Sequence, residues 1–377
     1  MKKVLFVATV VKTHINVFHI PYLKMLKEMG YETHVAARND FEDPKECIIP
    51  YCDYYHDIPF ERSPIKKNNI FSYKQLKQIM LEENYDIVHC HTPVGGAITR
   101  LVYKNIKSRV KTKCIYTAHG FHFFKGAPLK NWIIFYPIEK YLSKYTDVLI
   151  TINKEDYQRA KEKFKMKKLE YIPGVGVDEN KFKLKNFNRD EYRKNLGVSN
   201  NDFMILSVGE LIPRKNHKLV IDALSLINNH KIQYFIVGSG ELYNELDEYI
   251  KKLGLQHNIH LLGFRKDVAK LNKASDLFIF PSKQEGLPVA VMEAIISDTI
   301  CAVSNIRGNV DLIENNINGF LFDFKDVLYI KNIIEKIYSL SSKDKFKIIK
   351  NNNKIKSIVL FTNIKQKYKK IYESIII

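Results

Sequence analysis

The stretch LFIFPSKQEGLPVAVMEA, residues 277–294, joins a short apolar run to a loop and then to a helical pattern. Leu277–Pro281 predicts a buried strand, and Pro288 fits a first helical turn because proline has no N–H group to leave unpaired. Gly286 leaves the preceding amides uncovered. The stretch therefore predicts a strand–loop–helix unit of a parallel sheet, with free helix amides that suit an anion such as a diphosphate.

Short β-branched runs alternate with segments of helical period along the rest of the chain, which is typical of a parallel sheet with helices on both faces. The expected strands are Val4–Ala8, Thr33–Ala37, Ile87–Cys90, Cys114–Ala118, Val148–Ile152, Glu170–Ile172, Phe203–Gly209, Gln233–Gly238, Ile259–Leu262, Leu277–Pro281 and Ile300–Ser304.

A Gly- and Pro-punctuated segment, residues 173–178, and a Lys/Asn-rich stretch to about residue 189 separate the two halves. We therefore predict an α/β protein of two Rossmann-like, doubly wound domains facing across a cleft, residues 1–180 and 190–360. Residues 361–377 are expected to form a helix that packs back on the N-terminal domain. Ligands of such sheets bind at the carboxyl ends of the strands, so motifs that follow strands are the candidates for function.

The composition of the 377 residues, 45% hydrophobic and 27% charged, indicates a folded protein and excludes wholesale disorder and a multi-span membrane protein. The formal charge of +19 favours an anionic partner, namely phosphate, a nucleotide, nucleic acid or acidic lipid, although a spread of solvated lysines explains part of it equally well. Five dispersed cysteines without a C-x-x-C pair predict reduced thiols in the cytosol. The opening MKK and its apolar run lack a signal-peptide cleavage site, and we predict them to be the first strand.

Three loops after predicted strands contain residues suited to a phosphate. Arg214 and Lys215 lie at a predicted helix start, where side chains and amides attract the same anion, although a solvated basic turn explains them as well. The glycines of the next two loops allow close approach of backbone to a ligand, or simply a tight turn. These loops contain Gly238 and Gly240, and Phe264 and Arg265.

Two carboxylates flank the anion site predicted at residues 282–294. Glu285 lies in the loop and Glu293 about two turns further along the helix. Because a carboxylate repels an anion, both are expected to accept hydrogen bonds from sugar hydroxyls on either side of it. Taken singly, either residue could instead be an ordinary surface glutamate or a helix-capping glutamate. That alternative explains the two together poorly.

These residues resemble the retaining glycosyltransferases of family 4, which have the GT-B architecture of two Rossmann-like domains. The resemblance covers nearly the whole chain, and the pair Glu285 and Glu293 is its most specific element. Residues 308–313 and 318–322 also resemble segments of that family. The loop TAHGFHFFKG, residues 117–126, is similar to the family's histidine loop, most like transferases that build capsular or exopolysaccharide repeat units.

The resemblance implies transfer of a hexosyl or N-acetylhexosaminyl group from a nucleoside-diphosphate donor, expected to be a UDP-sugar, to a lipid-diphosphate-linked saccharide. It implies that Glu285 and His119 contact the donor sugar, Glu293 the ribose, and Lys215 with Arg214 the diphosphate. The expected catalytic residues are then His119, Lys215 and Glu285. The expected donor-binding residues are Arg214, Lys215, Gly238, Gly240, Phe264, Arg265, Glu285, Gly286, Leu287, Pro288 and Glu293.

The chemistry predicted for this site needs neither a metal nor a cofactor. No D-x-D motif occurs, and fixed amides with Lys215 can stabilise the leaving diphosphate. With no assignable covalent nucleophile, we hypothesise front-face attack by the acceptor hydroxyl, whose proton goes to the departing phosphate oxygen. His89 and His91 end a strand without nearby carboxylates, so we interpret them as a polar strand end rather than a metal site. Candidates for the acceptor side are His14, His91 and His122, and a surface or capping role explains His14 equally well.

The chain also departs from the family pattern. Glu210 stands where many members have a phosphate-binding arginine, and residues 297–300, with Asp298, lack the usual small, Gly and Pro pattern. The first loop, residues 9–14, lacks the glycines of many relatives. These departures make reduced activity an open alternative.

A cluster of cations at residues 104–113 and an aromatic, Lys-containing segment at 121–136 suit an anionic bilayer surface. With the resemblance, they predict peripheral association with the inner face of the bacterial cytoplasmic membrane, weakened by salt. Two other functions stay open. A sugar-nucleotide epimerase of the same fold would convert its substrate without an acceptor, and a basic nucleic-acid-binding protein would explain the charge, although no recognisable module is present and no nucleic-acid partner is expected.

Overall fold

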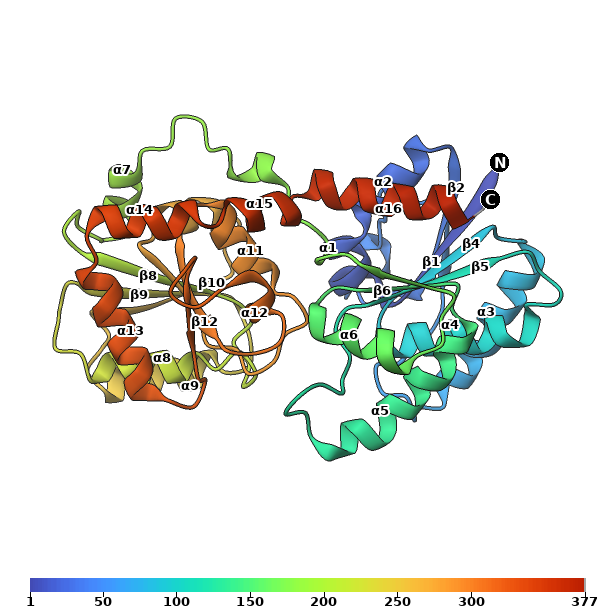
Figure 1. Ribbon diagram of the computed structural model, residues 1–377, viewed down its shortest axis with the longest axis horizontal. Helices are drawn as coiled ribbons and strands as arrows, with labels where there is room; N and C mark the ends of the chain where they lie inside the picture. The colour runs from blue at the N-terminus through green and yellow to red at the C-terminus, as the bar shows by residue number, and fades with distance from the viewer. Residues whose placement is uncertain (376–377) are drawn as a thin grey trace. The chain divides into compact units, whose positions relative to one another are not determined.

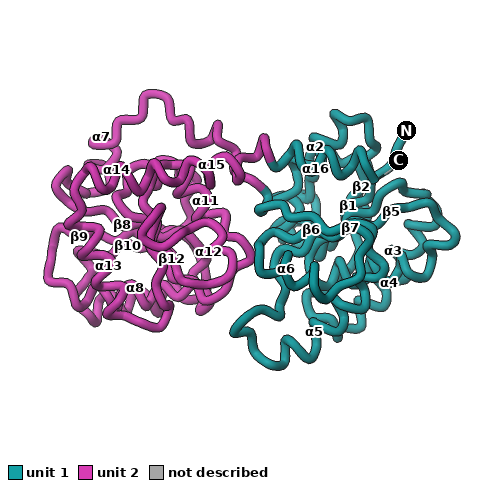
Figure 2. Tube along the Cα trace, viewed as in Figure 1, with its two compact units in different colours: residues 1–175, 364–377 teal, residues 176–363 magenta. Residues whose placement is uncertain are grey.

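The computed structural model describes residues 1–375. The chain divides into two compact units, of which unit 1 comprises residues 1–175 with the C-terminal helix from Ile364, and unit 2 comprises residues 176–363 (Figure 2). Each unit contains one parallel sheet between helices, which confirms the predicted class of two Rossmann-like α/β layers (Figure 1). The chain passes between the units after Val175 and after Asn363, a few residues from the predicted divisions.

The sheet of unit 1 has seven strands in the order β3-β2-β1-β4-β5-β6-β7, and all neighbours are parallel. All four residues of β4 are buried, because helices cover both faces of the sheet and only apolar or paired side chains fit there. The strands are β1 (Lys2–Val10), β2 (Tyr31–Arg38), β3 (Tyr54–Asp57), β4 (Ile87–Cys90), β5 (Lys113–Ala118), β6 (Val148–Thr151) and β7 (Lys168–Tyr171).

The helices of unit 1 lie on both sides of this sheet (Figure 1). They are α1 (Asn16–Phe18), α2 (Ile20–Glu28), α3 (Asn68–Glu82), α4 (Pro93–Ile106), α5 (Leu129–Leu142), α6 (Lys154–Lys163) and α16 (Phe361–Ile375). A π-helical turn, η1 (Val11–Ile15), follows β1, and short 3-10 turns are η2 (Pro44–Glu46) and η3 (Ser143–Tyr145). The main core of the unit lies between α3, α4 and the strands they cover.

The C-terminal helix α16 packs on unit 1 through two tyrosines. The Tyr372 hydroxyl lies 2.5 Å from Nδ1 of His89, and the Tyr368 ring lies 4.7 Å from that of Tyr22. At the surface, Nζ of Lys365 donates to Glu28 at 2.8 Å. The amphipathic pattern of this helix therefore buries one face against residues that are more than 280 positions away in sequence.

The sheet of unit 2 has six parallel strands in the order β10-β9-β8-β11-β12-β13. The strands are β8 (Phe203–Val208), β9 (Ile232–Val237), β10 (Ile259–Gly263), β11 (Leu277–Phe280), β12 (Ile300–Ser304) and β13 (Phe320–Phe322). The core is formed by these strands with the buried stripes of α8 (His217–Ser225) and α13 (Val327–Ser339).

Polar residues start several helices of unit 2, because their side chains accept from unpaired amides of the first turn. Asp326 caps α13 and Ser341 caps α14 in this way. The remaining elements are η4 (Glu179–Phe182), α7 (Arg189–Asn195), α9 (Tyr243–Lys252), α10 (Val268–Ala274), α11 (Val289–Ile296), α12 (Asn309–Leu312), α14 (Ser342–Lys350) and α15 (Asn353–Val359).

Two strands, β3 and β13, were not among those predicted. Both lie at the edge of a sheet, where few neighbours demand an apolar pattern. Strand β3 reads YYHD with every residue at least partly exposed, and β13 has only three residues. No helix within residues 1–375 is both long and apolar enough to span a bilayer.

Candidate functional site

One carboxylate oxygen in unit 2 collects three hydrogen-bond donors. Oε1 of Glu285 accepts from the Ser282 hydroxyl at 2.6 Å, from Nζ of Lys215 at 2.7 Å and from Nη1 of Arg214 at 2.9 Å. The side chains of Glu285 and Lys215 are only 10% and 12% exposed, so these charge-assisted bonds are poorly screened by water. The structure thus brings together three residues that the sequence assigned to one site, and adds Ser282, which the sequence analysis did not single out.

The turn between β8 and α8 positions the two cations. Its last residue, Asn216, adopts a left-handed conformation at φ 58° and lets α8 begin at His217. Nζ of Lys215 lies 4.8 Å from the centre of the buried Phe280 ring, and the backbone carbonyl of Arg214 accepts from the amide of Lys283 at 2.9 Å. The two loops are therefore held together by backbone as well as by charge.

Helix α11 begins beside this cluster. Pro288 is the residue before the helix, with ψ 120°, so the helix starts at Val289, one position later than predicted. The loop before it is tightly packed, because a Cβ on Gly308 would lie 2.4 Å from the carbonyl oxygen of Gly286. Leu287 is buried at 7% exposure and anchors the loop. The unpaired amides of the first turn of α11 thus follow Glu285 directly along the chain.

Glu293 lies on α11 and is partly buried. Burial raises the pKa of its carboxyl to about 7, against the smaller, opposing effect of the positive charge of Lys181. Within residues 1–375 this carboxylate has no ion-pair or hydrogen-bond partner. It is therefore available to a ligand, and its expected contact with sugar hydroxyls stays a prediction.

The glycines after β9 bring backbone against backbone. A Cβ on Gly238 would lie 1.9 Å from the carbonyl oxygen of Gly209, and one on Gly240 would lie 2.4 Å from that of Leu211. The Leu211 amide donates to the Ser239 carbonyl at 2.9 Å across the same contact. The loop that bears Arg214 and Lys215 therefore leaves no room for a side chain at Gly238 or Gly240. This close packing explains the two glycines without a bound ligand.

The other predicted donor-side residues lie at the surface of unit 2. Phe264 is 73% exposed, and Arg265 forms a two-bond ion pair with Asp267 at 2.8 and 2.6 Å. Hydrogen bonds from Arg265 hold the pKa of Asp267 down at about 2. Glu210 is 68% exposed, and its Oε2 lies 3.8 Å from Nη2 of Arg214, so the cluster of two cations also faces a second carboxylate.

Asp298 occupies the turn between α11 and β12 with φ 65°, a backbone conformation that glycine adopts more readily. Its carboxylate accepts from Lys273 and Lys356, which tie the turn to α10 and α15. The departure from the family pattern at this position is therefore accommodated locally by ion pairs.

In unit 1, four histidines from the segments after three strands gather at the carboxyl end of the sheet. His14 and His19 follow β1, His91 follows β4 and His119 follows β5. The rings of His14 and His119 lie 5.2 Å apart and those of His19 and His91 4.0 Å apart, while His91 Nδ1 is 3.2 Å from His119 Nε2. The predicted candidates His14, His91 and His119 thus lie together, with His19, which the sequence analysis did not assign. His122 instead stacks on Phe135 at 4.6 Å.

Burial keeps this histidine cluster uncharged. Removal from water lowers the pKa of His14 and of His89 to about 3 and that of His119 to about 4, and lowers those of His19 and His91 well below the ordinary value. Neighbouring imidazoles add to the effect for all but His119, because each would repel a second positive charge.

The backbone beside the cluster is unusual in two places. Thr92, directly after His91, has φ 62°, which is strained for a β-branched residue. Its hydroxyl lies 2.7 Å from that of Thr9. His14 lies in the π-helical turn η1, a form that is often found at functional sites. Strain held by its surroundings is typical of binding sites.

The sequence of this chain is similar to known families over most of its length. Residues 3–153 match the family described as "Glycosyl transferase 4-like", and residues 188–355 match "Glycosyl transferases group 1". The "Putative glycosyltransferase EpsD" of Bacillus subtilis (strain 168) is 38% identical over 341 residues, which cover 89% of this chain and 87% of that protein. The chain belongs to the family 4 glycosyltransferases.

A second relative of this glycosyltransferase has a name that states its reaction. The "UDP-Gal:alpha-D-GlcNAc-diphosphoundecaprenol alpha-1,3-galactosyltransferase" of Escherichia coli is 33% identical over 314 residues, covering 78% of this chain and 79% of that protein. Both matches span most of each chain, so the likeness includes both units.

Solved structures share the fold of the whole glycosyltransferase. Anabaena HepE, solved with UDP and glucose, superimposes with a TM-score of 0.80 at 19% identity, covering 99% of this chain and 100% of that one. WaaG, a glycosyltransferase involved in lipopolysaccharide biosynthesis, gives 0.73 at 16%, covering 98% and 99%. These structures have the GT-B fold, which confirms the predicted architecture.

The arrangement in unit 2 can bind an anion and then release it. Arg214 and Lys215 supply two positive charges, and Glu285 holds both in place through one oxygen atom. An anion that reaches them competes with Glu285, while the first-turn amides of α11 add donors of fixed direction. Ser282 could have been found from the sequence as a hydroxyl directly after a buried strand. His19 could not, because no spacing signal links it to His119.

Proposed function

We propose that this glycosyltransferase moves a hexosyl or N-acetylhexosaminyl group from a UDP-sugar to a lipid-diphosphate-linked saccharide, with retention of configuration and without a metal. The convergence of Arg214, Lys215 and Ser282 on Glu285 at the start of α11 carries the proposal. It provides cations and amides where a diphosphate would leave, with a carboxylate beside them. The E. coli relative, named for a UDP-Gal donor and a diphosphoundecaprenol acceptor, supports the choice of substrates.

In the proposed reaction the acceptor hydroxyl oxygen forms a bond to the anomeric carbon on the face from which the diphosphate departs. The bond between that carbon and the phosphate oxygen breaks, and the hydroxyl proton passes to the departing phosphate. Lys215 and Arg214 neutralise the charge that develops on the diphosphate. In metal-dependent transferases a bound cation stabilises this charge, whereas here the two side chains do so. Trapping of a glycosyl adduct on a side chain would contradict this route.

The other assignments remain predictions from the family resemblance. Glu285 is expected to contact the donor sugar, and Glu293 is expected to accept from the ribose hydroxyls. His119 is expected to contact the donor sugar, and His14, His91 and His122 the acceptor. Exposed Phe264 and the paired Arg265 are the least supported of the donor-side residues, because Asp267 already accepts from Nε and Nη2 of the Arg265 guanidinium.

A donor screen tests the proposed transfer. The purified chain is incubated with each common nucleotide sugar and a membrane lipid extract, and release of the nucleoside diphosphate is followed. We expect release with a UDP-sugar only when lipid is present, and a fall of about 100-fold or more in Lys215→Ala and Glu285→Ala. Lys218→Ala is the matched control, because Lys218 is exposed and pairs with Asp222 on the same helix.

Three results would count against the proposal. Release that needs no lipid, with conversion of the sugar in the nucleotide, would indicate an epimerase. Silence with every donor, alongside measurable nucleotide binding, would indicate an inactive relative and direct attention to Glu210 and Asp298. Loss of release after dialysis against a chelator, restored by a divalent cation, would overturn metal independence.

We also propose that unit 1 associates with the cytoplasmic face of the membrane through helices α4 and α5, which would bring the lipid-linked acceptor to the enzyme during capsule or exopolysaccharide assembly. Helix α5 exposes Leu129 at 74%, Ile133 at 65% and Ile134 at 47%. A cavity of about 480 Å³ between α4 and α5 is lined mainly by apolar side chains, among them Leu101 and Ile138.

Lysines border this apolar surface. Nζ of Lys104 lies 5.3 Å from the Tyr141 ring, and Nζ of Lys107 lies 5.1 Å from that of Tyr145. Cations beside exposed apolar residues suit the headgroup region of an anionic bilayer. We expect sedimentation with acidic liposomes that falls as salt rises, and loss of binding in Ile133→Asp, whereas the equally exposed Leu328→Asp in unit 2 keeps it. Binding that ignores salt, or that survives Ile133→Asp, would contradict this surface.

A further inference from the structure

The histidine cluster of unit 1 has ring nitrogens that the chain leaves without partners. Both nitrogens of His19 and Nε2 of His14 are buried, and neither residue has a hydrogen-bond partner for these atoms within residues 1–375. His19 is only 2% exposed. Buried polar atoms in folded proteins are nearly always paired, so these atoms indicate a partner from outside the chain.

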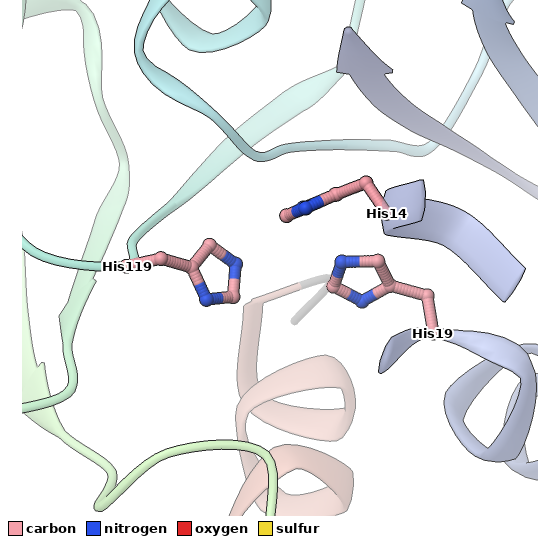
Figure 3. Close-up of side chains that lie close together, drawn as sticks. All are labelled: His14, His19 and His119. Atoms are coloured by element: carbon pink, nitrogen blue, oxygen red, sulfur yellow. The ribbon is translucent and has the colours of Figure 1, made fainter. Parts of the chain in front are cut away.

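Three of the rings converge on one point. One ring nitrogen from each of His14, His19 and His119 lies within 4.8 Å of the other two. The rings approach one another from the turn η1, the start of α2 and the loop after β5 (Figure 3). Because β1 and β5 flank β4 in the sheet, the topology places all three segments at the same edge.

We propose that His14, His19 and His119 form a binding site for a divalent transition cation of the Zn²⁺ type. Three imidazoles without a carboxylate suit zinc, cobalt, nickel or copper, whereas calcium and magnesium require oxygen ligands. Zinc–nitrogen bonds are about 2.0–2.1 Å long, so a small rotation of the rings brings the nitrogens to ligand distance. Three protein ligands leave a fourth position open, as in zinc sites that bind water or a substrate oxygen.

A second layer of side chains supports the three ligands. His91 Nδ1 lies 3.2 Å from Nε2 of His119, and His89 lies beside it with Nε2 2.8 Å from the Thr117 hydroxyl. Such contacts fix the orientation of metal-binding imidazoles. His91 is therefore a positioning residue for the proposed site, and its loss should weaken binding without changing the number of ions bound.

Another group of three possible ligands in unit 1 differs in one decisive respect. Glu32, His34 and Glu83 already share a cation of the chain, because Nζ of Lys3 lies 2.8 Å from Glu83 and 3.4 Å from Glu32. His34 is hydrogen-bonded to Glu32 at 2.9 Å and to the Tyr85 hydroxyl at 2.8 Å. The polar atoms of this group therefore have partners within the chain. The group serves as a control for the histidine cluster, in which several ring nitrogens have none.

The proposed cation goes beyond the proposed transfer reaction, with which it shares one residue, His119. The leaving diphosphate is assigned to Arg214 and Lys215 in unit 2, so its stabilisation does not require the metal. In unit 1 the ion would tie η1 and the start of α2 to the loop after β5. It would also hold the ring of His119, the residue that the family resemblance assigns to the donor sugar.

The test uses the full-length chain, stripped with a chelator and titrated with Zn²⁺ and with Co²⁺. We expect one ion per chain, a visible Co²⁺ absorption spectrum of nitrogen coordination, and a higher thermal midpoint with Zn²⁺. His14→Ala and His119→Ala should abolish stoichiometric binding. His91→Ala should weaken it about 10–100-fold and keep one ion per chain. His122→Ala, from the same loop as His119, is the matched control and should bind as the wild type does.

Any of three outcomes would overturn the proposal. The first is that the stripped wild type binds no Zn²⁺ or Co²⁺ at concentrations near 100 μM. The others are metal binding that persists in His14→Ala and His119→Ala, and metal binding that is lost in His34→Ala. His14 is partly exposed, so its variant should fold even if a change at buried His19 does not. Sugar transfer by the stripped chain is measured separately, so failure of the metal site and failure of the proposed reaction remain distinguishable.

Discussion

Replacement of Glu285 by glutamine should have opposite effects on nucleotide binding and on turnover. In the free protein Oε1 of Glu285 accepts from Nζ of Lys215 at 2.7 Å and from Nη1 of Arg214 at 2.9 Å. In the proposed reaction the diphosphate must reach these same two cations. Unit charges about 3 Å apart attract by roughly 5 kcal/mol at an effective dielectric constant of about 20, and solvent and the retained amide oxygen offset most of this. We therefore expect Glu285→Gln to bind UDP tighter by about 1 kcal/mol, roughly fivefold.

Turnover of Glu285→Gln should nevertheless fall by about 100-fold, because the Glu285 carboxylate is expected to contact the donor sugar, and a charge placed there acts mainly in the transition state. Isothermal titration with UDP and initial rates of diphosphate release measure the two effects, and thermal unfolding checks that the variant folds. Glu335→Gln is the control, since this exposed residue pairs with Lys331 at 2.7 Å on the surface of the same unit. Weaker UDP binding by a folded Glu285→Gln would refute the competition between carboxylate and diphosphate.

Three further changes concern an exposed carboxylate near the site, a buried glutamate and a buried ion pair. Glu210→Gln should tighten UDP binding about 1.4- to fivefold at low salt and less at high salt, because an exposed carboxylate 3.8 Å from a site cation contributes about 0.2–1 kcal/mol; an effect that persists at 1 M salt would contradict this. Burial raises the pKa of Glu293 from 4.5 to about 7, so the stability linked to its proton is fully present below pH 4.5 and is lost as the pH rises through 7. Urea unfolding from pH 5 to 8 should show this loss in the wild type and a flatter profile in Glu293→Gln, and parallel profiles would rule out this linkage. Arg100→Met should cost about 3–5 kcal/mol in urea unfolding, since it leaves the buried Glu139 carboxylate without its two-bond partner, and a loss below 1 kcal/mol would show that the pair is dispensable.

Most of the strands that the sequence predicted are buried on both faces, although the partly exposed edge strands β7 and β10 were predicted as well. In β4 and β8 almost every side chain must be apolar or paired, so the apolar run alone identifies the strand. The edge strands β3 and β13 have fewer neighbours, and their sequences could equally form loops. The start of α11 was misplaced by one residue because Pro288 fits both the position before a helix and its first turn.

The candidate site of unit 2 was predictable because its parts are local. Arg214 and Lys215 follow one strand, Ser282 and Glu285 follow another, and parallel neighbours β8 and β11 bring the two loops to the same edge. The glycines at 238 and 240 were also found, although their tight contact with the neighbouring loop shows only in three dimensions.

The histidine cluster was only partly predictable from sequence. The register of β1, β4 and β5 decides which side chains meet, and the π-helical turn η1 sets where His14 and His19 point. Neither feature leaves a spacing pattern. The sequence therefore indicated His14, His91 and His119 separately but gave no reason to join them with His19.

Mass analysis of a defined lipid acceptor tests whether this glycosyltransferase adds a sugar to a lipid-linked saccharide. The chain is incubated with a UDP-sugar and a synthetic polyprenyl-diphosphate-linked saccharide, and the lipid product is examined by mass spectrometry and by NMR of its new linkage. We expect a mass gain of one hexose or N-acetylhexosamine, with the anomeric configuration of the donor, that is absent in Lys215→Ala. A lipid of unchanged mass while UDP is released, or a product of inverted configuration, would contradict this expectation.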